Sequence, residues 1–96
     1  MKYYLYRGDE LLGTITHDED DFPWHLGEFE AAEAFSGVRP LFQKERQFHK
    51  QGARDEWEKT RKEIDGPGIR LEPVGGGKTI DKILICIEEN SVWWKC

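Results

Sequence analysis

Residues 83–87 read Ile-Leu-Ile-Cys-Ile, and this apolar run is the feature that most constrains how the chain can fold. Side chains along a β-strand point alternately to its two faces, so a strand that is apolar throughout needs cover on both. A run of this length is typical of a strand and is short for a helix. The sequence therefore predicts a central strand of a sheet, buried on both faces or nearly so.

Two helices are predicted in the middle of the chain, over residues 38–51 and 53–65. In each, one side of the helix is formed by side chains that recur at helical spacing. These are Val38, Leu41, Phe42 and Phe48 in the first helix, and Ala53, Trp57, Thr60 and Ile64 in the second. Gly52 ends the first helix, and the Gly-Pro-Gly of residues 66–68 ends the second. Because the link between them is short, we expect an antiparallel helical hairpin.

The start of the chain predicts a β-hairpin that turns at Gly8-Asp9, a dipeptide suited to a two-residue turn. That turn places Leu5 opposite Leu12 and Arg7 opposite Glu10. Both faces of this hairpin carry apolar groups, so we expect it to be covered on one side and partly covered on the other.

Residues 17–30 join an acidic run to alternating aromatic and aliphatic side chains. Pro23 has no N–H to donate and Gly27 weakens strand pairing, so we expect a short edge strand or an ordered loop here. After the helices, residues 69–74, 79–88 and 92–94 have strand patterns. The order of elements predicts an α+β fold, in which one antiparallel sheet, made of the N-terminal hairpin and the C-terminal strands, packs on the helical hairpin.

The composition excludes several classes of protein. The formal net charge is −5, whereas a general nucleic-acid binder is usually basic, so nucleic acid is not an expected partner. No apolar run approaches the roughly 18 residues that a membrane span needs, and no signal peptide is recognisable. Two cysteines are too few for a disulfide scaffold. We therefore expect a cytoplasmic protein of one domain, residues 1–96, that does not associate with a membrane.

No group of residues predicts catalysis, a cofactor or a metal ion. Gly77-Lys78-Thr79 shares residues with a phosphate-binding loop, but a buried strand follows it where that motif requires a helix. Cys86 lies in the most apolar run, where burial raises the pKa of a thiol and makes it unreactive. Neither cysteine is close in sequence to a histidine, whereas zinc sites favour sets of His and Cys ligands. We predict no catalytic residue, no cofactor and no metal site.

Basic side chains gather on one side of the first predicted helix. At about 100° per residue, Arg39, Arg46 and Lys50 fall within about 40° of one another. This ridge can bind an anion such as a phosphate group, or it can pair with the acidic run at residues 18–21. We favour the internal pairing, because a partner in the same chain is present at high effective concentration.

Aromatic residues are abundant: four tryptophans, three tyrosines and five phenylalanines make up 12% of the chain. Trp93 and Trp94 are adjacent, so on a strand they point to opposite faces and cannot both enter one side of a sheet. Trp24 follows the acidic run, and the sequence likewise does not decide whether its ring is buried or exposed. Such rings either complete the core of a small protein or anchor its contact with a partner.

Residues 20–30, Asp-Asp-Phe-Pro-Trp-His-Leu-Gly-Glu-Phe-Glu, are followed by Phe35 and by Arg39-Pro40-Leu41-Phe42. This pattern resembles a family of small uncharacterised bacterial proteins that likewise start with a Tyr-rich hairpin and end near a Trp pair. The resemblance covers most of the chain and implies a bacterial, cytoplasmic, free-standing domain. It transfers no activity and no catalytic residue.

The sequence thus predicts a small non-enzymatic protein-interaction module. A protein partner, or a second copy of the chain in a homodimer, would contact an aromatic patch framed by acids, formed by Asp21, Phe22, Trp24, His25, Trp93 and Trp94. The rings would supply contact area and the acids would steer a basic partner. The alternative is a small enzyme or ligand binder with a pocket near His25 and Arg39, in which His25 is a general base and Arg39 anchors an anion.

Overall fold

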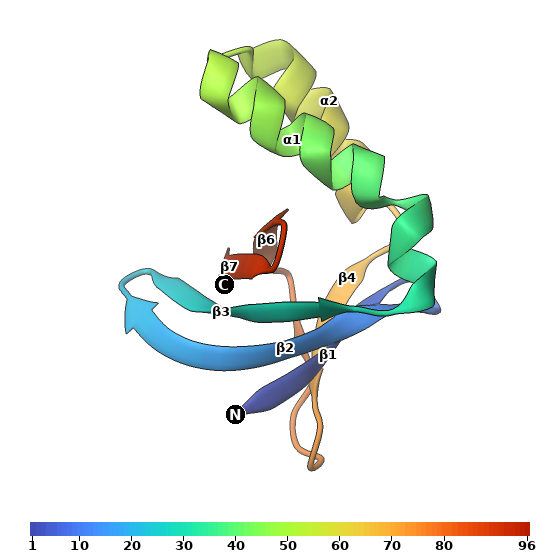
Figure 1. Ribbon diagram of the computed structural model, residues 1–96, viewed down its shortest axis with the longest axis vertical. Coiled ribbons are helices and arrows are strands. Elements are labelled where there is room, and N and C mark those ends of the chain that lie inside the picture. Colours follow the sequence, from blue (N-terminus) through green and yellow to red (C-terminus); the bar gives the residue numbers. More distant parts are fainter.

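One curled antiparallel sheet and a helical hairpin make up the computed structural model, which describes all 96 residues (Figure 1). The elements in chain order are β1 (Lys2–Arg7), β2 (Glu10–Asp21), β3 (Trp24–Ala31), the short 3₁₀ helix η1 (Glu33–Gly37), α1 (Arg39–Gln51), α2 (Arg54–Asp65), β4 (Ile69–Pro73), β5 (Ile80–Asp81), β6 (Leu84–Glu88) and β7 (Ser91–Lys95). The strands are ordered β5-β4-β1-β2-β3-β7-β6, and every neighbouring pair is antiparallel. This confirms the predicted α+β fold.

The sheet curls so that its two ends approach each other. Its end strands are β5 and β6, and only Lys82 and Ile83 separate them along the chain. Three Cα–Cα steps of about 3.8 Å span at most about 11 Å, so the two ends lie close together at this point. Strands from all parts of the sheet therefore share one apolar core, in which Leu5, Ile15 and Ile85 are completely buried.

Residues 84–87 of the apolar run lie in β6, at the end of the sheet, and Ile83 directly precedes this strand, so the prediction of a central strand is wrong. Ile85 and Ile87 enter the core, and Cys86, whose side chain points to the other face, is also buried. The helical hairpin supplies the missing cover: Nη1 of Arg61 donates a 2.7 Å hydrogen bond to the carbonyl oxygen of Ile85. An apolar run predicts that both faces of a strand are buried, but it does not show whether a neighbouring strand or a helix covers them.

The helical hairpin forms as predicted, with α1 and α2 joined by two residues (Figure 1). Gly52 takes a left-handed conformation with φ of 68°, and its N–H bonds the last carbonyls of α1. Figure 1 places both helices on the same side of the molecule, over β6 and β7. Phe42 of α1 and Ile64 of α2 reach into the shared core. Neither helix is long and apolar enough to cross a membrane.

The N-terminal hairpin has the predicted pair Arg7–Glu10, but Leu5 lies opposite Gly13 and not opposite Leu12. A β-bulge next to Leu5 inserts one extra residue on β2 and changes the alternation of side chains beyond it. Leu12 and Ile15 therefore both belong to the shared core, although simple alternation assigns these two residues to opposite faces.

The expectation of an edge strand or loop at residues 17–30 is wrong. The acidic run ends β2, a tight turn follows at Phe22 and Pro23, and β3 lies inside the sheet between β2 and β7. Pro23 is compatible with this because it occupies the turn, where no ladder hydrogen bond is needed. Residue 27 has to be glycine because the backbones of β3 and β2 approach closely there, and a Cβ atom would collide with the carbonyl oxygen of Thr16.

Candidate functional site

A groove of about 460 Å³ lies between the turn of the helical hairpin and the strands β3, β7 and β6. Its apolar lining is Trp24, Phe48, Trp57, Leu84, Cys86 and Trp93. Its other side chains are Arg46, His49, Arg54 and Lys95, and Gly52 completes the lining. We call it the indole groove, because three of the four tryptophans of the chain face it.

Cations stand over two of these indoles. The guanidinium carbon of Arg46 lies 5.1 Å from the centre of the Trp93 ring, and the ammonium of Lys95 lies 5.0 Å from the centre of the Trp24 ring. Both distances are those of cation–π contacts. No aspartate or glutamate is among the eleven lining residues, although the chain as a whole carries a net charge of −5. The lining of the indole groove is therefore aromatic and basic; Arg46 and Arg54 pair with Glu45 and Glu58 outside the lining, and Lys95 makes no ion pair.

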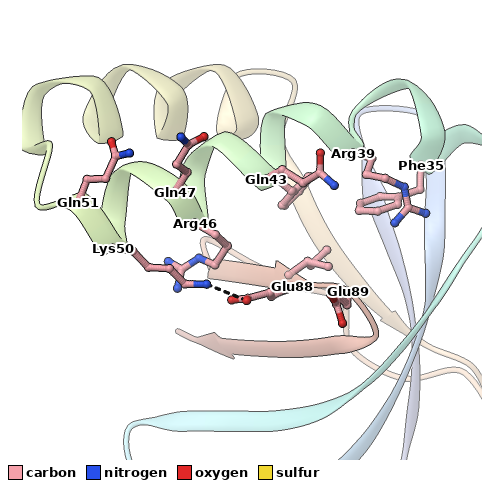
Figure 2. A pocket seen from close by; sticks show the side chains of 11 residues that line it. Phe35, Arg39, Gln43, Arg46, Gln47, Lys50, Gln51, Glu88 and Glu89 are labelled. Atoms are coloured by element: carbon pink, nitrogen blue, oxygen red, sulfur yellow. Dashed lines mark hydrogen bonds and ion pairs between the residues drawn. The ribbon is translucent and has the colours of Figure 1, made fainter.

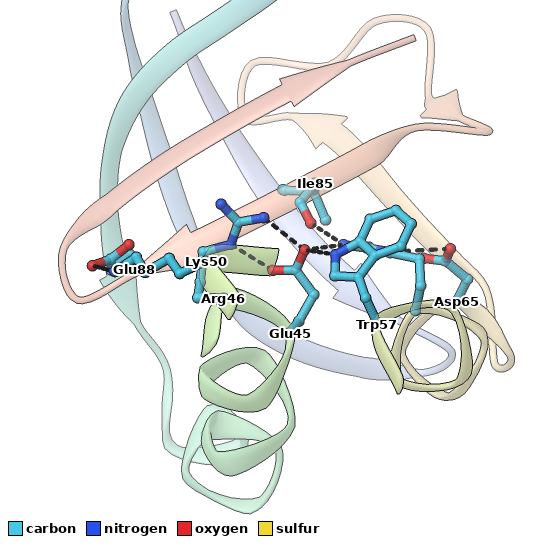
Figure 3. Close-up of polar contacts among 8 residues, drawn as sticks. Glu45, Arg46, Lys50, Trp57, Asp65, Ile85 and Glu88 are labelled. Carbon is cyan, nitrogen blue, oxygen red and sulfur yellow. Dashed lines mark hydrogen bonds and ion pairs between the residues drawn. The ribbon is translucent and has the colours of Figure 1, made fainter. Parts of the chain in front are cut away.

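Glu45 lies behind this groove as a completely buried carboxylate of α1 (Figure 3). Arg46 donates hydrogen bonds of 2.6 and 2.7 Å to its two oxygens, and the indole N–H of Trp57 donates one of 2.7 Å to Oε2. Burial opposes ionisation and is the largest single influence, but the hydrogen bonds from Arg46 and Trp57 and the nearby positive charges outweigh it. The pKa of Glu45 consequently lies below its ordinary value, and the residue stays ionised.

Arg61 of α2 extends the same network. Its guanidinium lies 3.9 Å from Oε2 of Glu45, donates a hydrogen bond to the carbonyl oxygen of Ile85, and pairs with Asp65 across 3.0 Å. No buried side-chain polar atom in the structure lacks a hydrogen-bond partner. A fully satisfied network of this kind holds side chains in one arrangement, so it fixes Arg46 and Trp57 in the wall of the indole groove.

Glu45 belongs to none of the motifs or patterns that predicted a site from the sequence. It stands three positions after Phe42 and three before Phe48, within the apolar side of the first helix. A carboxylate at such a position requires a buried partner, because an unpaired buried charge is very costly. This conflict with the apolar pattern is the one signal in the sequence that points to Glu45.

The thiol of Cys86 lies at the floor of the indole groove and is buried. Burial first, and the negative charge of Glu45 second, raise the pKa of Cys86 to about 11. At neutral pH this thiol stays protonated, and a protonated thiol is a poor nucleophile. Cys86 is thus part of the apolar floor and not a reactive group.

The three predicted anion-binding residues line a second cavity, also of about 460 Å³, between α1 and the turn that joins β6 to β7 (Figure 2). They are Arg39, Arg46 and Lys50. Glu88 and Glu89 line the same cavity, and Lys50 pairs with Glu88 across 2.8 Å. Figure 2 shows the contact between these two side chains, which connects α1 to β6.

The cations of this ridge have partners other than the acidic run at residues 18–21. Arg46 pairs with Glu45 and Lys50 pairs with Glu88, while the Arg39 guanidinium carbon lies 4.9 Å from the centre of the Phe35 ring. The favoured pairing of the ridge with residues 18–21 is therefore wrong, because that run lies on the β2–β3 hairpin and the nearer acids come from α1 and β6.

The structure brings only part of the predicted partner-binding patch together. Trp24 and Trp93 both line the indole groove. Phe22 is 96% exposed at the tip of the β2–β3 hairpin, and Asp21 precedes it; neither lines the groove. Trp94 is 2% exposed and packs edge-on against Tyr3, so it belongs to the core.

His25 and Arg39 are also separated by the fold. Arg39 lines the cavity beside α1, which His25 does not line. His25 lies on β3, where its Nδ1 is 2.5 Å from Oδ1 of Asp20, and Nε2 of His17 is 2.8 Å from the same oxygen. The hydrogen bond with His25, and then that with His17, lowers the pKa of Asp20 below its ordinary value. These three side chains offer the nitrogen and oxygen donors that metal ions bind.

Comparison of the chain with protein-family models, with curated proteins and with solved structures finds no significant match. The chemical character of the indole groove is therefore the basis for assigning a function. It offers aromatic contact area, positive charge and a rigid wall, and its thiol is held in the unreactive form.

Proposed function

We propose that this protein is a small non-enzymatic interaction module, and that its indole groove binds a short acidic segment that carries an aromatic side chain. The observation that supports this most directly is the lining of the groove, which combines three indoles with Arg46, Arg54 and Lys95 and contains no carboxylate. The proposal includes a cytoplasmic location, which suits a chain whose two cysteines are both free.

Aromatic contacts would provide most of the binding energy. Tryptophan and arginine are enriched among the residues that dominate protein interfaces. Trp24, Trp57 and Trp93 are each half-buried, so their rings are held by the fold and still present a face to the groove. Rings that are already fixed lose little conformational entropy on binding, and this favours affinity.

Charge would determine which partners are accepted. We expected acids to steer a basic partner, but the acids of residues 18–21 do not line the groove and its cations do. An acidic partner is therefore the complementary one. Nucleic acid also carries negative charge, but the net charge of −5 and the acidic hairpin oppose the long-range attraction on which its binding depends.

The proposal is tested with peptides selected on the protein from a random library and then measured by fluorescence polarisation. Selected peptides should combine Asp or Glu with Trp or Phe, and Lys95→Glu and Trp93→Ala should each weaken binding at least tenfold. Phe22→Ser is the matched control, because this ring lies outside the groove, and it should change affinity less than twofold. Selection of basic peptides, or tighter binding of a single-stranded oligonucleotide than of any peptide, would contradict the proposal.

A second copy of the chain is one specific occupant, because the molecule itself carries an acidic segment with an exposed ring. Asp18-Glu19-Asp20-Asp21 leads directly to Phe22, which is 96% exposed. If this tip enters the groove of a neighbour, Phe22→Ser and Lys95→Glu should each weaken self-association in sedimentation equilibrium. An equimolar mixture of the two variants retains one intact tip and one intact groove, so it should associate more strongly than either alone. A wild-type chain that stays monomeric at millimolar concentration would exclude self-association and leave the peptide experiment unaffected.

A further inference from the structure

Two imidazoles and one carboxylate converge near the tip of the β2–β3 hairpin. Nε2 of His17, Oδ1 of Asp20 and Nδ1 of His25 all lie within 4.8 Å of one another. We propose that these three atoms bind a divalent transition-metal ion, with Zn²⁺ as the reference ion. This site lies outside the indole groove, none of whose lining residues it shares, so the two proposals stand on separate observations.

The backbone explains why the three donors meet. Asp20 and His25 are direct cross-strand partners in the β2–β3 ladder, whereas His17 lies opposite Gly27. Regular alternation would place His17 and Asp20 on opposite faces of β2, because their separation of three residues is odd. A β-bulge between His17 and Glu19 inserts one residue and brings both onto the face of His25. Bulges are frequent where a strand has to aim a side chain at a site.

The spacing suits a metal ion with small adjustments. The two imidazole nitrogens lie 2.8 and 2.5 Å from the same Asp20 oxygen, as hydrogen-bonded groups do. Zn²⁺ with bonds of about 2.0–2.1 Å in a tetrahedral site holds neighbouring ligand atoms about 3.3 Å apart. Each imidazole–carboxylate pair therefore needs to open by less than about 1 Å, and the two imidazole nitrogens, which lie within 4.8 Å of each other, need to approach by at most about 1.5 Å. The ion would take the place of the protons in these two hydrogen bonds.

The donor set is one that transition metals favour. Two imidazoles and one carboxylate are found in catalytic zinc sites and in open sites for other divalent ions. Asp20 is 59% exposed and His25 is 41% exposed at the side chain, so water can reach the remaining coordination positions. Asp18, Glu19 and Asp21 adjoin the donors in sequence and make the local potential negative, which attracts a cation.

Trp94 holds the two imidazoles in place from the side of the core. Its ring centre lies 5.6 Å from that of His17 and 5.5 Å from that of His25, and the indole itself is 2% exposed. Aromatic packing of this kind restricts the orientation of both rings before an ion arrives. A ligand set that is already oriented gives tighter binding than mobile side chains with the same donors.

The test is calorimetric titration of the full chain with Zn²⁺, together with the visible spectrum of Co²⁺ as a report on coordination. We expect one ion per chain, and we expect Asp20→Asn and His25→Ala each to weaken Zn²⁺ binding at least tenfold. Two matched controls are Asp21→Asn, the neighbouring carboxylate, and His49→Ala, the histidine outside the cluster. His49→Ala should change the affinity less than twofold, and Asp21→Asn, which removes a nearby negative charge but no donor atom, should weaken binding far less than Asp20→Asn does. The exposed Cys96 also carries a group that can ligate zinc, so Cys96→Ser is tested as well and should leave the affinity unchanged.

Nitrogen NMR shifts of the histidines provide an independent readout at the level of single atoms. On addition of one equivalent of Zn²⁺, Nε2 of His17 and Nδ1 of His25 should shift as metal-bound nitrogens do, and His49 should not. Absence of binding at millimolar Zn²⁺ would overturn the proposal. The same holds if the control variants lose as much affinity as Asp20→Asn, which would mean adventitious binding to surface acids. Thermal unfolding of each variant confirms that the chain remains folded.

Discussion

The indole N–H of Trp57 donates a 2.7 Å hydrogen bond to Oε2 of Glu45, and this bond connects the buried charge of the helical hairpin to the wall of the indole groove. Trp57 lies on α2 and Glu45 on α1, so the bond also fixes one helix against the other. Because the same carboxylate holds Arg46, the stability of the hairpin and the shape of the groove depend on one residue.

Glu45→Gln should strongly destabilise the protein. The amide removes the negative charge that faces the guanidiniums of Arg46 and Arg61, and it presents N–H groups to donors that need an acceptor. Breaking a buried ion pair by removing one partner costs about 3–5 kcal/mol of the free energy of unfolding. The measurement is urea denaturation at pH 7. Glu58→Gln, which removes an exposed surface pair with Arg54, is the control and should cost less than about 1 kcal/mol.

Acid should remove the contribution of Glu45. Its pKa is lowered in the folded protein, whereas the unfolded chain titrates near the ordinary value of 4.5. The unfolded state therefore binds more protons below about pH 4.5, and the free energy of unfolding falls as the pH drops toward the lowered native pKa. Urea curves at pH 7 and pH 3.5 should show the wild type losing more stability than Glu45→Gln. Equal losses in the two proteins would show that folding does not lower the pKa of Glu45, and a smaller loss in the wild type would show that folding raises it.

The two cysteines should differ sharply in reactivity. The pKa of Cys86 is raised to about 11, mainly by burial, whereas Cys96 is exposed at the end of the chain. With an aromatic disulfide reagent at pH 8, one thiol per chain should react within minutes and the second only after unfolding in denaturant. Cys96→Ser should abolish the fast phase. A fast phase that survives this substitution would mean that Cys86 is accessible in the native state.

Gly13→Ala should destabilise the sheet by about 1–3 kcal/mol, as overpacking of a close-packed site does. A Cβ atom at this position would lie 2.5 Å from the carbonyl oxygen of Glu30 and 2.6 Å from the ring of Phe29, and neither can move freely inside the sheet. Gly37→Ala is the control, because nothing lies within 4 Å of its Cβ position. It should be neutral, or stabilising by up to about 1 kcal/mol, in the same thermal and urea unfolding measurements.

Local patterns were sufficient to predict several elements of this fold. The helices are read from apolar spacing and from Gly52, and the pair Arg7–Glu10 is read from the turn beside it. These features depend on residues close together in sequence, so their physical causes are visible there. The burial of Ile83, Ile85, Cys86 and Ile87 is equally a property of composition, and it is observed even though the strand lies at the end of the sheet.

What depends on distant residues was decided by the tertiary structure. The bulges beside Leu5 and His17 set which side chains share a face, and no single-strand pattern encodes them. Trp24 and Trp93 meet at one groove only because β3 pairs with β7, and Glu45 stays ionised only because Arg46, Trp57 and Arg61 surround it. The sequence by itself determined the helices, most strands and the identity of the apolar residues. Strand order, register and the environment of each charge arise from contacts across the chain, where packing and electrostatics outweigh local preference.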